Sequence, residues 1–138
     1  MGDCIFCSIV AGEIPSVKVM ETPRILAFLD IAPVNHGHTL VIPKEHHESL
    51  LDLPDDLWTE MGRVSRQVAR ALQKALYARA FNVGMNNFEA AGQVVFHAHL
   101  HVIPRYTNDG LYLFPQGVYQ PEEMEKVGQQ LRKVLGGR

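Results

Sequence analysis

Three histidines alternate with apolar residues in the stretch Phe96–Pro104, which reads FHAHLHVIP. The branched and aromatic surroundings predict a β-strand, in which successive side chains point to opposite faces. His97, His99 and His101 would then share one face, while the residues between them pack on a core. Three imidazoles in register seldom serve packing, so this stretch predicts a functional site.

The spacing limits what the three imidazoles can do together. In a regular strand, which rises about 3.3 Å per residue, His97 and His101 lie roughly 13 Å apart, too far for one metal ion to bind all three rings. Two adjacent rings can share one ligand, so the three histidines are expected to have different roles. A row of imidazoles suits an anionic, extended substrate such as a phosphate chain, with one ring as nucleophile and its neighbours as donors.

The only two cysteines, Cys4 and Cys7, form a CxxC motif. A short helix is predicted from Asp3 to Val10, with Asp3 as its N-cap, and cysteines three residues apart face the same way on a helical turn. Three interpretations fit the motif: a pair of zinc ligands, a redox dithiol, or two small apolar residues of a core. No thioredoxin-like βαβ pattern follows the motif, so zinc is favoured over redox chemistry.

Two further candidates lie in predicted loops. Asp30 could cap a turn or accept hydrogen bonds from both hydroxyls of a ribose, and the turn is the simpler interpretation of the residue by itself. Gly92 and Gln93 offer a backbone donor and an amide donor close to the expected phosphate position. An ordinary hairpin loop explains the same two residues.

The elements that must position these residues are strands set apart from one long helix. Apolar residues at helical spacing predict that helix from Pro54 to about Ala80, and a final helix is predicted from Pro121 to Leu135. This order favours an α+β fold with an antiparallel sheet over βαβ winding. Besides the histidine strand, the predicted strands are Val17–Glu21, Ile25–Leu29, Thr39–Pro43 and Phe81–Met85.

The carboxy-terminal part is unusually apolar outside regular elements. Leu111–Tyr119 is rich in aromatic residues and is expected to pack on a neighbouring chain or over the site. The final helix carries an apolar face made of Met124, Val127, Leu131 and Val134.

Composition sets the broad class of the protein. A chain of 138 residues with 46% hydrophobic residues is expected to form a single domain over residues 1–138. The net charge of −2 gives no strong nucleic-acid signal. Neither a membrane-spanning stretch nor a signal peptide is apparent, so a cytoplasmic protein with no membrane partner is expected.

The segment HAHLHVIPR, with HTLVIPKEH upstream, resembles the histidine triad, or HIT, superfamily. Similar stretches run through CIFCSIVAGEIPS, FLDIAP and GQVVFHAHLHVIPRY, while the carboxy-terminal part matches more loosely. The chain is most similar to small bacterial-type HIT hydrolases of the Hint branch. The resemblance implies a five-stranded antiparallel sheet with one long helix and a C-terminal helix, a homodimer, and a purine nucleotide bound beside the triad.

The resemblance also implies chemistry at phosphorus. His99 would attack the α-phosphate of a nucleoside phosphoramidate, dinucleoside polyphosphate or other adenylated compound, forming a nucleotidyl-histidine that water then cleaves. The protein would thus be a nucleotide hydrolase or nucleotidyl transferase. Imidazole is a good nucleophile at neutral pH, and flanking donors stabilise charge on the phosphate oxygens.

The remaining site residues follow from the same resemblance. It places His38, Gln93 and His101 at the phosphate, with Asn86 nearby, and makes Asp30 the ribose-binding acid instead of a turn cap. The base pocket would comprise Ile5, Phe6, Ile9, Phe28 and Ile31, although these residues by themselves indicate only a core.

A structural zinc ion and no organic cofactor are implied. The corresponding ligands are Cys4, Cys7, His46 and His97, a closed Cys2His2 set typical of structural zinc sites. A ring nitrogen of His97 that binds zinc cannot also protonate a leaving group. A closed set also disfavours a zinc hydrolase in which the metal activates water.

Val94 departs from the family pattern. Many Hint relatives carry serine or threonine at this position, two residues after Gly92, as a donor to the phosphate or the leaving group. The missing hydroxyl counts against activity on phosphoramidates but leaves the nucleophile in place. It keeps open the alternative of a nucleotide-binding interaction module with little or no catalysis.

Overall fold

A computed structural model describes residues 3–136 of the chain as five strands, three α-helices and two short 3₁₀ turns. In chain order these are α1 (Ile5–Val10), β1 (Lys18–Glu21), β2 (Ile25–Leu29), β3 (Thr39–Pro43), η1 (Leu50–Asp52), α2 (Asp55–Leu76), β4 (Ala80–Gly84), η2 (Glu89–Ala91), β5 (Leu100–Arg105) and α3 (Glu123–Leu135).

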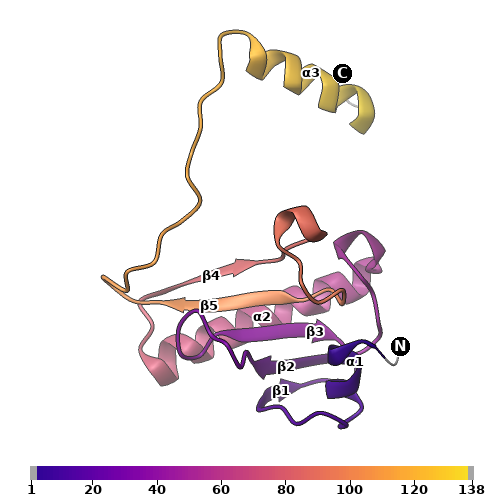
Figure 1. The fold of residues 1–138 in the computed structure, drawn as a ribbon, viewed down its shortest axis with the longest axis vertical. Coiled ribbons are helices and arrows are strands. Elements are labelled where there is room, and N and C mark those ends of the chain that lie inside the picture. Colours follow the sequence, from indigo (N-terminus) through magenta and orange to yellow (C-terminus); the bar gives the residue numbers. More distant parts are fainter. Residues whose placement is uncertain (1–2, 137–138) are drawn as a thin grey trace.

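One antiparallel sheet with strand order β1-β2-β3-β5-β4 organises the molecule, and α2 crosses one of its faces (Figure 1). This confirms the predicted α+β class and the five-stranded sheet with one long helix and a C-terminal helix. The central strands β2 and β3 are almost wholly buried because both faces of the sheet are covered. They therefore give the residues at their ends a rigid support.

Two apolar clusters lie on opposite faces of the sheet. The larger lies between the sheet and α2, and includes Leu57, Met61 and Val68. The smaller lies under α1 and consists of Phe6, Ile9, Leu26, Phe28, Leu40 and Ile42. The smaller cluster lies on the same face of the sheet as the triad histidines, and its residue Phe6 contacts the rings of His97 and His99.

Local backbone chemistry sets the two ends of α2. Pro54 is the N-cap, and Asp55 and Asp56 complement the helix dipole in the first turn. The helix ends at Leu76 because Tyr77 adopts a left-handed conformation with φ of 57°. It is therefore shorter than the predicted helix to Ala80, which is the first residue of β4. At the amino terminus, similarly, Cys4 and not Asp3 is the N-cap of α1.

The histidine strand begins later than predicted. β5 starts at Leu100, so His97 and His99 precede the strand and only His101 lies within it. Proline has no backbone N–H, and Pro43 at the end of β3 cannot donate to a continued ladder; its carbonyl accepts from the ring of His97 instead. The predicted alternation is nevertheless confirmed, because Ala98, Leu100 and Val102 are buried in the larger cluster.

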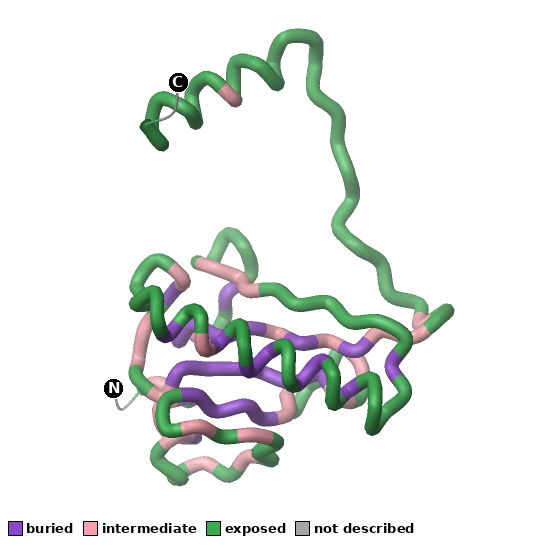
Figure 2. Tube along the Cα trace, turned by 180° about the vertical axis from the view of Figure 1, so that it is seen from behind, coloured by how far each residue is buried: buried purple, intermediate pink, exposed green. Residues whose placement is uncertain are grey.

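The segment from Leu111 to Leu135, here called the arm, stands apart from the sheet and α2 (Figures 1 and 2). The predicted final helix is present as α3, but its apolar face is exposed, as are the aromatic residues before it. The arm does not pack over the site of its own chain. Among residues 3–136 no helix is long and apolar enough to cross a membrane.

Candidate active site and metal site

Side chains from five separate segments meet around the start of β5. Two groups emerge, each with ligand atoms within 4.8 Å of one another. The first group, called the thiol cluster, is Cys4, Cys7, His46 and His97. The second is Asp30, His38 and His101, and it is called the phosphate cluster after the role predicted for its two histidines. His99 lies between them along the chain.

The thiol cluster has the dimensions of a tetrahedral zinc site. Sulfur to nitrogen distances are 3.4 Å from Cys4 to His97, 3.3 Å from Cys7 to His46 and 3.6 Å from Cys7 to His97, all to Nδ1. A tetrahedral ion with bonds of about 2.3 Å to sulfur and about 2.05 Å to nitrogen would separate these atoms by about 3.6 Å. The donor set and its spacing therefore fit zinc without movement of the backbone.

The tautomer of His97 also suits a metal ligand. Its Nε2 lies 2.7 Å from the Pro43 carbonyl oxygen. A carbonyl only accepts, so Nε2 carries the hydrogen and the lone pair of Nδ1 faces the thiols. Burial, followed by the neighbouring histidines, lowers the pKa of His97 to about 4, which keeps the ring neutral at pH 7.

The thiol of Cys7 is held in its protonated form by its surroundings. Burial, together with the adjacent Cys4, raises its pKa to about 11. A bound metal ion would remove the proton of this thiol.

The ring of His99 is held in a single orientation. It is buried, and its Nδ1 lies 2.7 Å from the His97 carbonyl oxygen, to which it must donate. The lone pair is therefore on Nε2, which makes no hydrogen bond among residues 3–136. Phe6 meets the ring edge to face, with centroids 5.1 Å apart, and burial lowers the pKa of His99. The ring is thus neutral and fixed at pH 7.

His101 is set in the opposite sense by a chain of hydrogen bonds. The backbone N–H of Val34 donates to His38 Nδ1 at 3.1 Å, so His38 carries its hydrogen on Nε2. That hydrogen is donated to His101 Nδ1 at 2.9 Å. His101 therefore carries its own hydrogen on Nε2, as a neutral donor. Burial, with His99 and His38 beside it, lowers the pKa of His101 to about 4.

Asp30 caps a turn, which is one of the two roles considered from the sequence. One carboxylate oxygen accepts from the Ala32 backbone N–H at 2.9 Å, as in a turn cap. The other lies 3.7 Å from His38 Nε2, at the edge of the phosphate cluster. The carboxylate is partly exposed and keeps acceptor capacity for a ligand.

Gln93 uses its side chain inside the protein. Its amide donates to the carbonyls of Glu48 and Val95 at 2.7 and 3.1 Å, and its Oε1 accepts from the Phe88 N–H at 2.7 Å. In this conformation it fastens the loop before the triad and does not offer a free amide donor. Asn86, also predicted near the phosphate, lies partly buried beside Gly92 in the same loop.

The residues predicted for the base pocket fall into two kinds. Phe6, Ile9 and Phe28 are buried members of the smaller apolar cluster, and Phe6 and Phe28 stack edge to face at 5.5 Å. Ile5 is half exposed and Ile31 is almost fully exposed, at 97%. Phe6, Ile9 and Phe28 are therefore core residues, whereas Ile5 and Ile31 are exposed on the surface.

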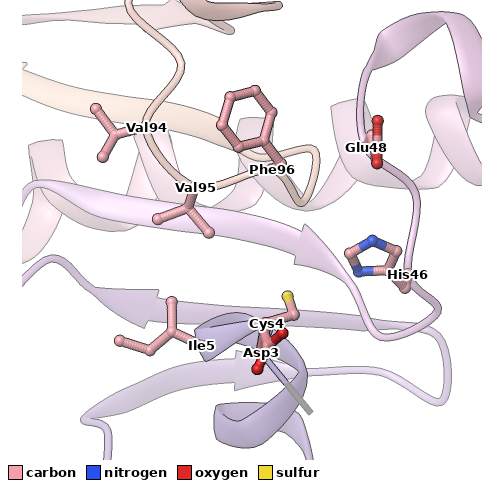
Figure 3. Close-up of a pocket in the computed structure, with 8 residues that line it drawn as sticks. All are labelled: Asp3, Cys4, Ile5, His46, Glu48, Val94, Val95 and Phe96. Atoms are coloured by element: carbon pink, nitrogen blue, oxygen red, sulfur yellow. The ribbon is translucent and has the colours of Figure 1, made fainter. Parts of the chain in front are cut away.

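A cavity of 370 Å³ opens beside the thiol cluster (Figure 3). Val94, Val95 and Phe96 lie on one side of it and Cys4 and Ile5 of the α1 region on the other. His46, Glu48 and Asp3 complete the lining. His99 and His101 are not among the residues that line the cavity.

Several functional groups escaped prediction because they belong to the backbone. The Pro43 carbonyl, the His97 carbonyl and the Val34 N–H decide which nitrogen of each histidine is free. Any residue type other than proline supplies the same N–H, and every residue supplies a carbonyl. No residue pattern could have indicated these partners.

Comparison with known proteins places this geometry in a family. The HIT domain model matches residues 11–108. The Bacillus subtilis protein hit is 42% identical over 96% of this chain and 94% of its own length. The adenosine 5′-monophosphoramidase hnt1 of Schizosaccharomyces pombe is 42% identical, covering 96% and 98%. Adenylylsulfatase HINT3 of Arabidopsis thaliana is 42% identical over 80% of this chain and 56% of its own.

Solved structures agree with the sequence comparisons. A HIT family member from Bacillus subtilis superimposes with a TM-score of 0.87 at 42% identity, covering 95% of this chain and 96% of its own. A zinc-bound histidine triad family protein from Mycobacterium smegmatis gives a TM-score of 0.78 at 39% identity, covering 98% and 94%.

Proposed function

The chain belongs to the HIT family, and we propose that it is a nucleotide hydrolase or nucleotidyl transferase acting at the α-phosphate of a purine nucleotide through His99. The observation that carries the proposal is the free Nε2 of a buried, neutral His99 whose Nδ1–H is held by the His97 carbonyl. Relatives named as an adenylylsulfatase and an adenosine monophosphoramidase support the substrate class.

The reaction proceeds in two displacements at phosphorus. His99 Nε2 forms a bond to the α-phosphorus while the bond to the leaving group breaks. The electron pair of that bond stays on the departing oxygen, or on a departing nitrogen that takes up a proton from solvent. Water then attacks the nucleotidyl-histidine; the P–N bond returns its electrons to Nε2, and the proton of the water is released. In transfer, another nucleophile takes the place of water.

His101 stabilises charge on the phosphate oxygens through its Nε2–H. A donor fixed before the reaction costs no reorganisation when charge develops, and such donors are worth about 10²- to 10³-fold in rate. His38 acts through His101 and is a positioning residue. In this proposal Asn86 contacts the phosphate, and Gln93 holds the loop that carries Asn86.

The nucleoside lies against the smaller apolar cluster. Phe6, Ile9 and Phe28 provide the floor of the base site, and the exposed Ile5 and Ile31 lie at its margins. Asp30 accepts from the ribose hydroxyls with its exposed oxygen, since a single carboxylate can accept both.

A zinc ion held by Cys4, Cys7, His46 and His97 is part of the proposal. The spacing of the donor atoms and the tautomer of His97 support it. Such an ion would tie α1 and the segment after β3 to the start of β5. It leaves no open position for water, so its contribution is to the fold and to the placement of His99.

A homodimer formed along β4 is also part of the proposal. β4 pairs with β5 on one side only and lies at the edge of the sheet, with all five of its residues exposed. Phe81 and Val83 are exposed apolar residues on this edge. An open apolar edge is an obvious surface for pairing with a second chain.

One observation favours a second candidate function, a nucleotide-binding module with little catalysis. Val94 is 84% exposed at the position where many relatives carry a hydroxyl, so it offers no donor to a leaving group. Tight binding of AMP without product release from several adenylated substrates would support this candidate.

Trapping the covalent intermediate tests the principal proposal. Protein is mixed with adenosine phosphoramidate or adenylyl sulfate labelled at phosphorus, quenched in alkaline detergent to preserve P–N bonds, and digested for mass spectrometry. We expect label on the peptide containing His99, and none in His99→Ala. The exposed His36→Ala variant is the matched control and should retain the adduct. Full turnover by His99→Ala, with its fold and zinc content intact, would refute the proposal.

A further inference from the structure

The arm has no partner among the described residues. In α3 the side chains of Met124, Leu131 and Val134 are 68%, 56% and 87% exposed. Their spacing, with Val127, places them on one face of the helix. An isolated helix of 13 residues is marginal in water, so this face indicates that the helix packs against something else.

An apolar groove of matching character lies at the far edge of the sheet. It has a volume of 550 Å³ and runs between β1 and the second half of α2. Its principal lining residues are Met20, Val68, Ala71, Leu72, Ala75 and Leu76. Ala71 and Ala75 are exposed and small, which leaves room for a helix to approach α2 closely.

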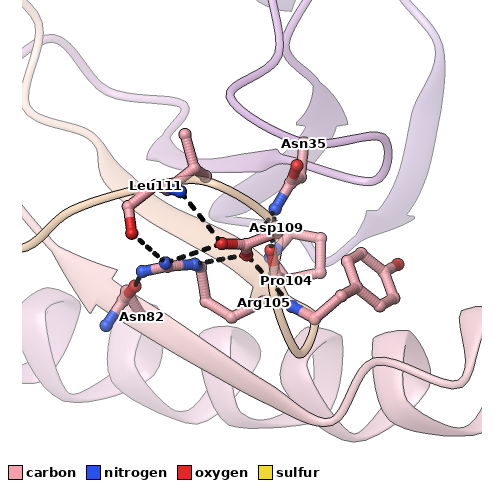
Figure 4. A network of polar contacts seen from close by, with 7 residues as sticks. Asn35, Asn82, Pro104, Arg105, Asp109 and Leu111 are labelled. Atoms are coloured by element: carbon pink, nitrogen blue, oxygen red, sulfur yellow. Dashed lines mark hydrogen bonds and ion pairs between the residues drawn. The ribbon is translucent and has the colours of Figure 1, made fainter.

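The root of the arm is fixed, and it sets the direction in which the arm leaves (Figure 4). The Arg105 guanidinium donates to Asp109 at 2.8 and 3.0 Å, to Asn82 Oδ1 of β4 at 2.8 Å and to the Leu111 carbonyl at 3.2 Å. Asn35 donates to Asp109 at 3.2 Å and to the Pro104 carbonyl at 2.9 Å. The chain is thus tied to β4 and β5 as far as Leu111.

Beyond this network the arm runs past β4 and away from β1, beside which the groove of its own chain lies (Figure 1). It occupies the side of the sheet on which a second copy would add. We propose that α3 of each copy packs in the β1–α2 groove of the other, so that the two arms are exchanged; this rests on the dimer along β4 proposed above.

The distances allow the exchange. The arm starts beside β4 of its own chain, and the groove of the second copy lies beside the β1 strand of that copy. The path therefore spans five strand spacings, or about 24 Å at about 4.8 Å per strand. The stretch from Tyr112 to Glu122 spans up to about 36 Å when extended. The arm is therefore long enough to cross the partner sheet and reach its far edge.

Charge is complementary at the two surfaces. Helical spacing places Arg63, Arg70 and Lys74 on the flank of α2 that borders the groove residues Gln67 and Ala71. The start of α3 carries an acidic group formed by Glu122, Glu123 and Glu125. A helix seated in the groove would bring the two groups together, which favours one orientation of α3.

Cysteine cross-linking tests the exchange. Two differently tagged full-length chains are co-expressed, one with Ala71→Cys in the groove and one with Leu131→Cys in α3, and are oxidised mildly. We expect a disulfide between the two chains, identified by peptide mass. Arg66→Cys, on an exposed position of α2 away from the groove, replaces Ala71→Cys in the matched control. Leu131→Cys with an unmodified partner controls for Cys4 and Cys7.

Light scattering separates the outcomes. A dimer without the 71–131 disulfide would overturn arm exchange and leave the dimer standing. A monomer would overturn both. A disulfide within one chain carrying both cysteines, at monomer mass, would show that α3 folds back on its own groove and would also overturn the exchange.

A second measurement does not depend on disulfides. Leu131→Asp puts a charge on the apolar face of α3 and should raise the dimer dissociation constant at least about 10-fold. Gln129→Asp adds the same charge at an exposed position off that face and should leave the constant within about 2-fold. Equal effects of the two variants would contradict packing through Leu131.

Discussion

The two ends of the histidine row use the same residue type to opposite effect. At the thiol cluster, the Pro43 carbonyl fixes the hydrogen of His97 on Nε2 and leaves Nδ1 as a lone pair. At the phosphate cluster, the Val34 N–H acts through His38 to leave His101 with a hydrogen on Nε2. One end is thereby suited to a cation and the other to an anion. Both rings carry their hydrogen on Nε2. They differ in which nitrogen the protein already uses: the Pro43 carbonyl uses Nε2–H of His97, whereas His38 uses Nδ1 of His101 and leaves its Nε2–H free.

His99 follows the same rule in the middle of the row. Its hydrogen is fixed by the carbonyl of His97, which is a member of the thiol cluster. The orientation of the proposed nucleophile therefore depends on the position of a proposed zinc ligand. Changes in the thiol cluster should mainly lower stability, and should alter catalysis only by moving His99. Changes in the phosphate cluster should alter catalysis directly.

Loss of the thiol cluster is expected to have the largest effect. Cys7→Ser removes one of four ligands and should release zinc. If zinc is normally present at about 1,000 times its dissociation constant, the free energy of unfolding should fall by about 4 kcal/mol. Urea unfolding with a parallel assay of bound zinc measures this.

Ser8→Ala is the matched control for Cys7→Ser because it changes the neighbouring position of α1 and no ligand. It should keep its zinc and most of its stability. A Cys7→Ser protein with unchanged zinc content and unfolding midpoint would contradict a Cys2His2 site.

Breaking the relay to His101 is expected to slow catalysis with a smaller effect on stability. His38→Phe removes the donor to His101 Nδ1, so the tautomer of His101 is no longer fixed, and kcat/KM should fall about 10- to 100-fold. His38→Gln can place an amide N–H near the same position and should recover part of the loss. The rates are measured with a labelled adenosine phosphoramidate.

Zinc content should stay the same in both His38 variants, because His38 is not a ligand of the thiol cluster. Equal rates for the Phe and Gln variants would show that His38 only fills space.

The pH dependence of stability should report on the phosphate cluster. The folded pKa of His101 is lowered to about 4 by burial, with His99 and His38 opposing and Asp30 favouring its charge. Unfolded histidine has a pKa of about 6.5, so the unfolded chain takes up a proton between about pH 6.5 and pH 4 while folded His101 does not. The contribution of His101 to the free energy of unfolding therefore decreases as the pH falls from about 6.5 to about 4, and is constant above about pH 6.5.

Urea unfolding at pH 7 and pH 5 checks this expectation. The wild-type protein should lose more stability between the two than His101→Gln, which has the same metal ligands and lacks the buried ring. NMR titration of His101, assigned from the same variant, should give a midpoint well below 6.5. Equal losses of stability would show that burial does not hold His101 neutral.

The sequence was sufficient to predict the fold and the residues of both clusters. It did not predict which ring nitrogen of each histidine carries the hydrogen. The alternation of His99 and Leu100 could be read because side chains alternate along extended backbone. The role of Gln93 could not, because its partners are the backbone atoms of Phe88, Glu48 and Val95, which have no residue-specific signature. The early end of the ladder depends on Pro43 facing His97 across the sheet, a contact between residues far apart in sequence.

The smallest expected effect concerns Val94, beside the thiol cluster. Its side chain is 84% exposed, so Val94→Ser should hardly change stability. The new hydroxyl lies on the loop that lines the 370 Å³ cavity and can donate to a departing amine, so kcat for phosphoramidates should rise up to about 10-fold. Val94→Ala, which shortens the side chain without a hydroxyl, should show no such rise, and adenylyl sulfate, whose leaving group needs no proton, should gain less than the phosphoramidate. An equal rise with Ala and Ser would show that extra space in the cavity, and not a donated proton, causes the effect. Catalysis would then depend on the histidines and not on a donor at position 94.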